Sequence, residues 1–232
     1  MARSLTDRLI DRIMHRGTVK AVHAVTPRMQ AVLLSVGALD WKPGQQVRVQ
    51  TGPGLLSPRR TYSVWDYDGG ADGGVMELRV LRHGAGPGAA WAAGLRPGQD
   101  VLFSGPEGGF TPRPSGYHLF AGEETAAVAF GPMLRALAGA PVYGVVEVDL
   151  PEDRLPLDLE WRYRRGAPAA GSATLVEAVR ALDLPDEPGT AYLAGEARTI
   201  QAVRAHLTAE RGWPRRSVLT KPFWTPGKKG LE

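Results

Sequence analysis

A short stretch near residue 60 combines a cation, an aromatic ring and a hydroxyl within one expected strand. The chain reads Arg-Arg-Thr-Tyr-Ser-Val-Trp from Arg59 to Trp65, and β-branched and aromatic residues of this kind favour a strand. Side chains alternate along a strand, so Arg60 and Tyr62 share one face, and the hydroxyl of Ser63 follows at once. A cation beside an aromatic ring offers a phosphate contact next to a flat surface for a planar ring, which is an arrangement suited to a flavin nucleotide. An ordinary strand with a buried tyrosine and a surface arginine has the same pattern, so the stretch alone leaves both interpretations open.

A glycine-rich segment after the next apolar run is the second candidate. It reads His-Gly-Ala-Gly-Pro-Gly-Ala-Ala-Trp-Ala from His83 to Ala92, and a helix is expected from Gly88 to Ala93. The first amides of a helix have no internal partner and lie at the positive end of its dipole, so this start is suited to a pyrophosphate. The alternative is a glycine-rich turn with Trp91 in the core. Arg60, one strand earlier, makes the anion site the better-supported interpretation.

The third candidate is the segment Phe-Ala-Gly-Glu-Glu-Thr-Ala from residue 120 to 126. It reads as another strand-to-helix turn, at the first strand of a predicted α/β domain, where such sheets bind ligands. It lacks the Gly-x-Gly-x-x-Gly pattern, so the backbone cannot wrap a pyrophosphate in the usual way. Thr125 is suited to cap the helix or to contact a phosphate. The pair Glu123–Glu124 favours the helix dipole but repels a phosphate.

Short apolar segments separated by glycine and proline fill the chain from residue 17 to 113. Their strand-like composition predicts a six-stranded antiparallel β-barrel. We expect the strands at residues 18–25, 30–36, 46–50, 60–65, 75–81 and 101–104. In front of the barrel, apolar residues at helical spacing predict an N-terminal helix within residues 1–16.

The pattern changes in the proline- and glycine-rich link at residues 112–116. From residue 114 to 232, expected strands alternate with expected helices, which predicts an α/β domain with a parallel sheet. The strands are expected at residues 117–121, 142–148, 191–194 and 218–220, and the helices at 124–137, 175–182 and 197–210.

Composition excludes several kinds of chemistry. The 232 residues include no cysteine, so this chain has no disulfide, iron–sulfur ligand or thiol nucleophile, and its five histidines lack metal-ligand spacing. No apolar run reaches the roughly 20 residues that span a bilayer, and the N-terminus is charged where a signal peptide is apolar, so we expect a cytoplasmic protein. The net charge of +4 is spread along the chain, without an aromatic-rich RNA-binding motif. We therefore expect neither a metal site nor a nucleic-acid partner.

Taken together, these segments resemble a known family. Arg60-Thr61-Tyr62-Ser63 is similar to the Arg-x-Tyr-Ser/Thr signature of ferredoxin–NADP reductase-like flavoproteins. Further segments resemble, in the same order, those of the siderophore-interacting protein family. They are His83-Gly84 with Gly86-Pro87 and Trp91-Ala92, Gly105-Pro106, Gly122 to Ala126, Val146-Glu147-Val148, Trp161 with Arg164–Arg165, Ala194 to Ala197, and Phe223-Trp224. No single motif is strongly specific, but the ordered set is.

The resemblance implies a barrel that binds FAD non-covalently and an α/β domain that binds NAD(P). The activity it implies is an NAD(P)H-dependent flavin reductase that passes electrons to ferric iron in a siderophore, with Fe(II) released. By the same resemblance, Arg60 holds the flavin phosphate, Tyr62 lies against the isoalloxazine and Ser63 bonds near its reactive nitrogen. Trp224 approaches the flavin from the C-terminus. Further FAD contacts are expected from His83, Gly86, Pro87, Gly88, Ala89 and Trp91, and nicotinamide nucleotide contacts from Gly122, Glu124, Thr125, Gly195, Glu196 and Ala197.

Departures from the family pattern concern the rim where the electron acceptor is expected. The family usually ends with Gly-Tyr-Trp-Arg, whereas this chain has Pro-Phe-Trp-Thr from residue 222 to 225, so the basic role there would pass to Lys228 or Lys229. Arg48 would replace a lysine of the rim. Glu107 is acidic at a position where family members often carry a basic or neutral residue. Anionic ferric siderophores favour a basic rim, so these departures bear on the acceptor and leave the expected flavin site intact.

Other functions remain open on the sequence alone. One alternative is a flavin- or siderophore-binding protein without turnover. Another is a flavin reductase for a different small acceptor or for a ferredoxin. NADH and NADPH are equally possible donors, because the acidic end of the second α/β strand, Glu147 to Asp149, suits ribose hydroxyls but is also typical of the family.

Overall fold

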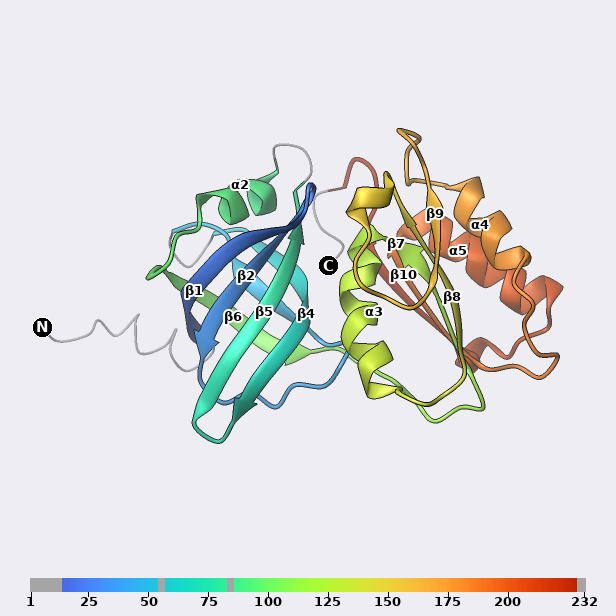
Figure 1. The fold of residues 1–232 in the computed structure, drawn as a ribbon, viewed down its shortest axis with the longest axis horizontal. Coiled ribbons are helices and arrows are strands. Elements are labelled where there is room, and N and C mark those ends of the chain that lie inside the picture. Colours follow the sequence, from blue (N-terminus) through green and yellow to red (C-terminus); the bar gives the residue numbers. More distant parts are fainter. Residues whose placement is uncertain (1–13, 54–56, 83–85, 229–232) are drawn as a thin grey trace, which may run out of the picture. The chain divides into compact units, whose positions relative to one another are not determined.

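The computed structural model describes residues 14–53, 57–82 and 86–228 (Figure 1). The chain forms two units, one ending at Gly109 and the other beginning at Phe110. The sequence predicted this boundary four residues later, after residue 113. Residues 110–113 go with the second unit because the ring of Phe110 packs edge-on against Tyr192, with centroids 5.8 Å apart, and the amide of Arg113 donates to the Tyr192 hydroxyl at 2.7 Å.

The first unit is a closed six-stranded antiparallel barrel, as the sequence predicted. Its strands run in the order β1-β2-β5-β4-β3-β6, with β6 pairing back to β1. They span His15–Thr26 (β1), Met29–Val36 (β2), Gln46–Gln50 (β3), Arg59–Gly70 (β4), Gly73–Leu81 (β5) and Asp100–Glu107 (β6). Alternate residues of each strand point inward, and the fully buried Leu34, Leu78 and Phe103 belong to the resulting core.

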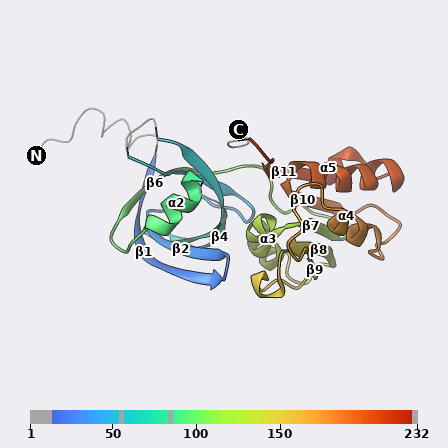
Figure 2. The same cartoon turned by 90° about the horizontal axis from the view of Figure 1, so that it is seen from above.

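Helix α2, Pro87–Gly94, lies across the barrel, as Figure 2 shows. Ala92 and the following Leu95 belong to the barrel core, and the side-chain amide of Gln30 donates to the Ala92 carbonyl at 2.7 Å. The helix is thus held at one place on the barrel by apolar packing and by a buried hydrogen bond.

The prediction of an N-terminal helix within residues 1–16 is wrong for its last two residues, His15 and Arg16. Residues 1–13 lie outside the described residues, but His15 and Arg16 are in β1 and pair with Phe103 and Leu102 of β6. The His15 ring stacks on Phe103 and Arg16 forms an ion pair with Asp100 at 2.7 Å. The conformation of His15 and Arg16 is decided by their pairing with β6, and the helical spacing of apolar residues in the sequence gives no information on that pairing.

The second unit is a parallel five-stranded sheet in the order β11-β10-β7-β8-β9, which confirms the predicted α/β fold. The strands are His118–Glu123 (β7), Val142–Val148 (β8), Glu160–Tyr163 (β9), Thr190–Glu196 (β10) and Val218–Trp224 (β11). The helices are Glu124–Ala136 (α3), Ala173–Arg180 (α4) and Ala197–Ala205 (α5), which continues as a π-helical segment at His206–Glu210. Short 3₁₀ turns lie at Pro151–Asp153 and Arg215–Ser217.

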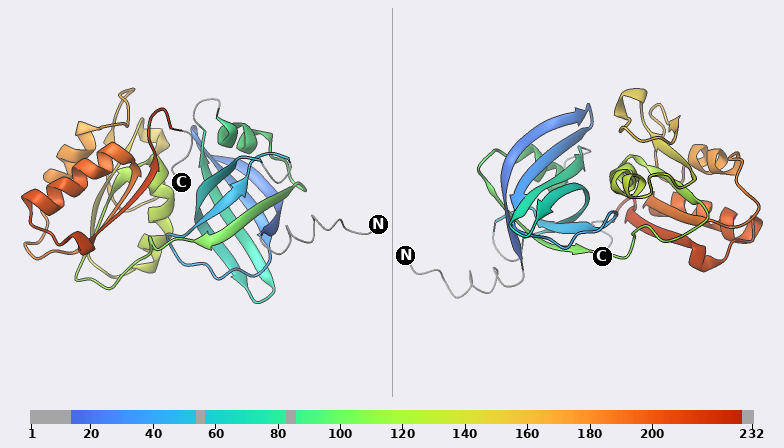
Figure 3. Two further views of the ribbon diagram at one scale, coloured as in Figure 1. Left: turned by 180° about the vertical axis from the view of Figure 1, so that it is seen from behind. Right: turned by 60° about the horizontal axis from the view of Figure 1, so that its bottom comes forward.

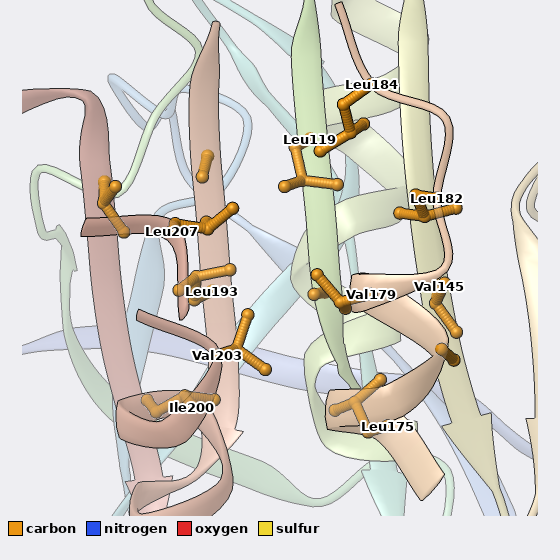
Figure 4. Packing of buried hydrophobic residues seen from close by; sticks show 14 of the residues in the cluster. Leu119, Val145, Leu175, Val179, Leu182, Leu184, Leu193, Ile200, Val203 and Leu207 are labelled. Carbon is orange, nitrogen blue, oxygen red and sulfur yellow. The ribbon is translucent and has the colours of Figure 1, made fainter. Parts of the chain in front are cut away.

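Helices cover both faces of this sheet (Figure 3). On one face, Leu119 and Leu193 of the strands pack against Leu175 of α4 and Ile200 of α5 (Figure 4). On the other, Phe120 packs edge-on against Phe130 of α3. Neighbouring residues of one strand thus serve opposite faces, as a parallel sheet with crossover helices requires. All four predicted strands of this unit are present, and β9 is an edge strand that the sequence did not predict.

Among the residues that the structure describes, no helix has the length and apolar character needed to cross a bilayer.

Candidate functional site

Several of the predicted flavin residues of the barrel unit come together where β4 meets the first turn of α2. Tyr62 stacks on Trp91, with ring centroids 5.4 Å apart and planes 22° from parallel. A Cβ added at Gly88 would lie 2.6 Å from the Tyr62 hydroxyl and 3.6 Å from Cγ of Arg60. Only glycine therefore lets the helix start approach these two side chains so closely. The sequence analysis expected Arg60 and the start of this helix to contribute to one anion site, and in the structure the two lie side by side.

The start of α2 has the properties of an anion site. The capping residue Gly86 is extended (φ −70°, ψ 160°) and contributes no side-chain hydrogen bond, Pro87 occupies the first turn, and that turn carries no acidic residue. The amides of Gly88 and Ala89 therefore lie at the positive end of a helix that no side chain caps. Arg60 donates one N–H to the carbonyl of Arg59 at 2.7 Å and has four more. These groups fit the pyrophosphate of FAD.

Tyr62 is suited to contact a planar ring as a neutral phenol. Burial, opposed in part by the nearby Arg60 charge, raises the pKa of Tyr62 to about 12. The phenol is therefore protonated at neutral pH. Ser63 pairs with Gln46 of β3 and is half-buried, and strand alternation directs it to the face opposite Tyr62. His83 lies outside the described residues.

At the predicted acceptor rim, two of the departures from the family pattern, Arg48 and Glu107, are partners. Arg48 of β3 donates through Nε to the Glu107 carboxylate of β6 at 2.6 Å, and both side chains are more than a third exposed. The acidic residue thus offsets the charge of the arginine. Sequence reasoning named both residues and missed the pair, since they are 59 positions apart. Lys228 is exposed after the last strand, and Lys229 lies outside the described residues.

In the α/β unit, a buried carboxyl lies where β7 ends. Glu123 is 2% exposed; it accepts from the amide and hydroxyl of Thr125, the amide at 2.9 Å, and from the indole Nε1 of Trp224 at 3.0 Å. Burial first, and then the adjacent Glu124 carboxylate, raise the pKa of Glu123 to about 7 against the opposing hydrogen bonds. This side chain was read from the sequence only as a contributor to the helix dipole.

A second carboxylate, Glu124, is paired with a cation that sequence reasoning did not assign to the site. Arg164, just after β9, donates to both oxygens of Glu124 at 2.6 and 2.7 Å, and both side chains are 5% exposed. Arg164 also lies 3.4 Å from Glu147 of β8, which accepts from Ser172 at 2.5 Å. Burial raises the pKa of Glu147, although Ser172 and Arg164 oppose it. The sequence did contain a signal for this contact, the pair Arg164–Arg165 after Trp161, but nothing in the composition linked that pair to Glu124.

The other predicted nucleotide-site residues divide by exposure. Thr125 and Ala197 are half-buried, whereas Gly122, Gly195 and Glu196 are buried and have structural contacts. A Cβ at Gly122 would meet the Ala194 carbonyl at 2.3 Å, and one at Gly195 (φ +117°) would meet the Glu123 carboxylate at 2.6 Å.

Glu196 caps α5. It accepts from the amides of Thr199 at 2.9 Å and Gly171 at 3.1 Å. Burial acts to raise its pKa, but these amides and that of Arg198 outweigh it and lower the pKa. Glu196 is therefore ionised and engaged with backbone N–H groups near the carboxyl ends of the strands.

Comparison with known proteins agrees with this arrangement. A family described as "Siderophore-interacting FAD-binding domain" matches residues 43–110, and one described as "Siderophore-interacting protein" matches residues 115–227. The ferric vibriobactin reductase ViuB of Vibrio cholerae is 28% identical over 200 residues, which cover 79% of this chain and 72% of ViuB.

Two solved structures have the same fold. The siderophore-interacting protein SipS of Aeromonas hydrophila superposes with a TM-score of 0.80 at 24% identity, over 94% of this chain and 93% of SipS. A siderophore utilization protein of T. fusca superposes with a TM-score of 0.78 at 24% identity, over 94% of this chain and 95% of the other. With matching family models on both units, the chain belongs to the siderophore-interacting protein family.

Proposed function

We propose that this chain is an FAD-dependent NAD(P)H oxidoreductase that reduces ferric iron held by a siderophore and so releases Fe(II). The observation that carries the proposal is the meeting of Arg60, Tyr62 and the uncapped start of α2 at Gly88. Membership of the family and the likeness to a ferric vibriobactin reductase support the choice of acceptor. Reduction releases the metal because Fe(II) is softer and less charged than Fe(III), and hard oxygen ligands bind it more weakly.

In the barrel unit, each residue has a binding task. Arg60 and the first amides of α2 hold the pyrophosphate by charge-assisted hydrogen bonds. Tyr62, kept neutral by burial and braced by Trp91, offers its ring to the isoalloxazine. The hydroxyl contact of Ser63 near the reactive nitrogen is proposed from the family resemblance alone, since strand alternation directs this side chain to the face opposite Tyr62. When bound, FAD supplies the redox chemistry, taking two electrons as a hydride and giving them up singly, so no protein acid or base is required for that transfer.

In the α/β unit, the nicotinamide nucleotide is proposed to bind at the carboxyl ends of β7 and β10, where parallel sheets with crossover helices bind ligands. Thr125 and Ala197, the half-buried residues at the starts of α3 and α5, are the proposed contacts. Both helix starts are capped by carboxylates, Glu123 at α3 and Glu196 at α5, so the proposed contacts come from Thr125 and Ala197 and not from free helix-start amides. Gly122 and Gly195 act indirectly, by letting the strands and the Glu123 carboxyl pack closely. Either NADH or NADPH is compatible with this site.

The experiment begins with the absorption spectrum of the purified protein after incubation with FAD and removal of excess. We expect a bound-flavin spectrum that bleaches on anaerobic addition of NADPH or NADH. Adding a ferric siderophore should then restore the oxidised spectrum while an Fe(II)-specific chelator develops colour. A protein that takes up no FAD would refute the proposal.

The same experiment separates the alternatives. Bound flavin that neither nicotinamide bleaches would indicate a binding protein without turnover. Flavin that bleaches but is not reoxidised by ferric siderophores would indicate another acceptor, and a ferredoxin is then the next to add. A different acceptor is a real alternative because the Arg48–Glu107 pair reduces the positive charge at the predicted rim, and a basic rim is what an anionic ferric siderophore favours.

A further inference from the structure

The carboxyl of Glu123 is held in one orientation from several directions. Thr125 contacts both oxygens, its amide donating to Oε2 and its hydroxyl to Oε1. The indole Nε1 of Trp224, the last residue of β11, donates to Oε1 at 3.0 Å. These two residues are 101 positions apart, so this is a tertiary contact between the ends of β7 and β11. The side chain is 2% exposed, which leaves water little access to replace either partner.

The strand between β7 and β11 is shaped to let this contact form. β10 lies between them in the sheet, and its Gly195 has a φ of +117°, a conformation that favours glycine. A Cβ there would lie 2.6 Å from Oε1 and 3.1 Å from Cγ of Glu123. The register between β10 and β11 also shifts between Gly195 and Glu196, which brings Trp224 opposite Glu196. Gly195 therefore leaves the space that the carboxyl fills.

Charged groups face Glu123 from several of the packed elements. Glu124 of α3 is adjacent in the chain and repels its ionised form. Glu147 of β8 is opposite Glu123 in the parallel pairing. The cation nearby, Arg164, is committed to Glu124 through two short hydrogen bonds. From β10 and β11, Gly195 and Trp224 approach the carboxyl and carry no charge, while the Glu196 carboxylate, opposite Trp224, is bonded to backbone amides.

We propose that Glu123 is a positioning residue for Trp224: its carboxyl, braced by Thr125 and accommodated by Gly195, sets the orientation of the indole at the end of β11. The inference rests on the proposed function in one respect, because the family resemblance is what assigns Trp224 to the reaction. A carboxylate accepts a hydrogen bond more strongly than a neutral acid. The hold on Trp224 is therefore tighter when Glu123 is ionised. Since burial and Glu124 raise the pKa of Glu123 to about 7, that change falls near neutral pH.

The contact is tested on the full chain without cofactor, by ¹H–¹⁵N correlation spectra of the indole N–H groups. The chain has six tryptophans, and the Trp224 resonance is assigned by its loss in Trp224→Phe. In the wild-type protein we expect this resonance to move with pH from 5.5 to 8.5, with a midpoint near 7. In Glu123→Gln, which keeps an acceptor oxygen but cannot ionise, the pH-dependent movement should be lost. Glu123→Ala should move the resonance to the position of an unbonded indole.

Matched variants keep the test decisive. Glu160→Gln removes an exposed carboxylate of β9 and should leave the Trp224 titration unchanged. Thr125→Val removes the hydroxyl that bonds to the Glu123 carboxyl, so the pH titration of the Trp224 resonance should become less sharp. Thr125→Ser keeps a hydroxyl and should restore the wild-type titration. The dispersion of the remaining amide resonances shows that each variant is folded. A Trp224 resonance that ignores both pH and Glu123→Ala would overturn the proposal.

A kinetic arm on the FAD-loaded protein connects the contact to the reaction. The pH profile of kcat/KM for the nicotinamide donor should inflect near 7 in the wild-type protein, and Glu123→Gln should lose this inflection. An unchanged profile would overturn the positioning role in turnover. Failure of FAD uptake, in contrast, would refute the proposed function while the indole resonance still decides whether Glu123 holds Trp224.

Discussion

Arg60 and Gly88 serve the proposed FAD site in opposite ways, one through a charge and the other through the absence of a side chain. Arg60 is half-buried on the face of β4 that also carries Tyr62, and its stem lies beside the start of α2. Gly88 lets that start approach the Tyr62 hydroxyl. Each contribution can be removed singly, and the neighbouring residues provide controls.

Arg60→Ala should weaken FAD binding by roughly tenfold or more, because charge-assisted hydrogen bonds to a phosphate are each worth about 1.5–3 kcal/mol. Arg59→Ala removes the same charge from the adjacent exposed position and should change the FAD dissociation constant little. Titration followed by flavin fluorescence measures both. Equal losses in the two variants would indicate that net charge, and not the position of Arg60, governs binding.

Gly88→Ala should also weaken FAD binding, since the new Cβ would lie 2.6 Å from the Tyr62 hydroxyl and force the Tyr62–Trp91 stack to move. Overpacking of this kind costs about 1–3 kcal/mol. Gly94→Ala, in the last turn of the same helix, meets no atom within 4 Å and should preserve affinity. Thermal unfolding with and without FAD separates a loss of affinity from a loss of fold.

At the scale of elements, α3, β8 and the segment after β9 are joined through one cation. Arg164 is bonded to Glu124 at both oxygens and lies near Glu147, so two buried carboxylates share its charge. Burying ions is costly, and a buried pair is strongly destabilised when one partner is removed. This arrangement ties the edge of the sheet to the first helix of the unit.

Arg164→Met should therefore destabilise the protein by about 3–5 kcal/mol. Arg162→Met, which breaks an exposed pair with Glu160 on β9, should cost about 1 kcal/mol or less. Urea unfolding followed by circular dichroism compares them. The double variant Arg164→Met with Glu124→Gln should recover part of the loss, since one of the uncompensated charges is removed. A small effect of Arg164→Met alone would contradict the shared-cation interpretation.

The Arg48–Glu107 pair links β3 to the end of β6, and its removal tests the predicted rim. Glu107→Gln frees the arginine charge, so KM for an anionic ferric siderophore should fall by about two- to fivefold, as a partly exposed charge contributes roughly 1 kcal/mol or less. The effect should shrink at high salt. Asp100→Asn removes one negative charge from the other end of β6, about 23 Å away along the strand, and is the control. If Glu107→Gln and Asp100→Asn change KM equally, Arg48 does not belong to the acceptor rim.

At the scale of the whole molecule, Glu123 should make stability depend on pH. Its pKa is about 7 when folded, against an ordinary value of 4.5. A raised carboxyl pKa means that ionisation disfavours the folded state. This penalty is absent below about pH 4.5, grows as pH rises to about 7, and is constant above that, reaching on the order of 3 kcal/mol.

The free energy of unfolding of the wild-type protein, relative to Glu123→Gln, should therefore decrease between pH 5 and pH 7.5 and then level off. Denaturant unfolding at a series of pH values measures this difference, and comparing the two proteins cancels the other titrating groups. Because the chain has two units, the transition of the α/β unit must be followed separately. A difference that is independent of pH would show that Glu123 titrates at its ordinary value.

Local sequence patterns predicted the bounds of an element correctly where the residues that define the element all lie within it and its flanking turns. β3 and β8 have the predicted bounds, because turn residues end each apolar run. β6 continues past the predicted Ser104 to Glu107, since Gln46 of β3 pairs there although Gly105-Pro106 reads as a turn. β9 went unpredicted because it is four residues long and half-exposed at the sheet edge, so it lacks a hydrophobic period.

The amino-acid sequence alone was sufficient for the two-unit architecture, the strand that carries Arg60 and Tyr62, the helix start at Gly88 and the resemblance to the family. These features depend on composition and spacing within short segments. Tertiary structure alone decided that Arg48 pairs with Glu107, that Arg164 joins Glu124 and Glu147, and that Glu123 holds Trp224. Charges and hydrogen-bond donors act over a few ångströms, and only the folded chain brings residues 17 to 101 positions apart within that range.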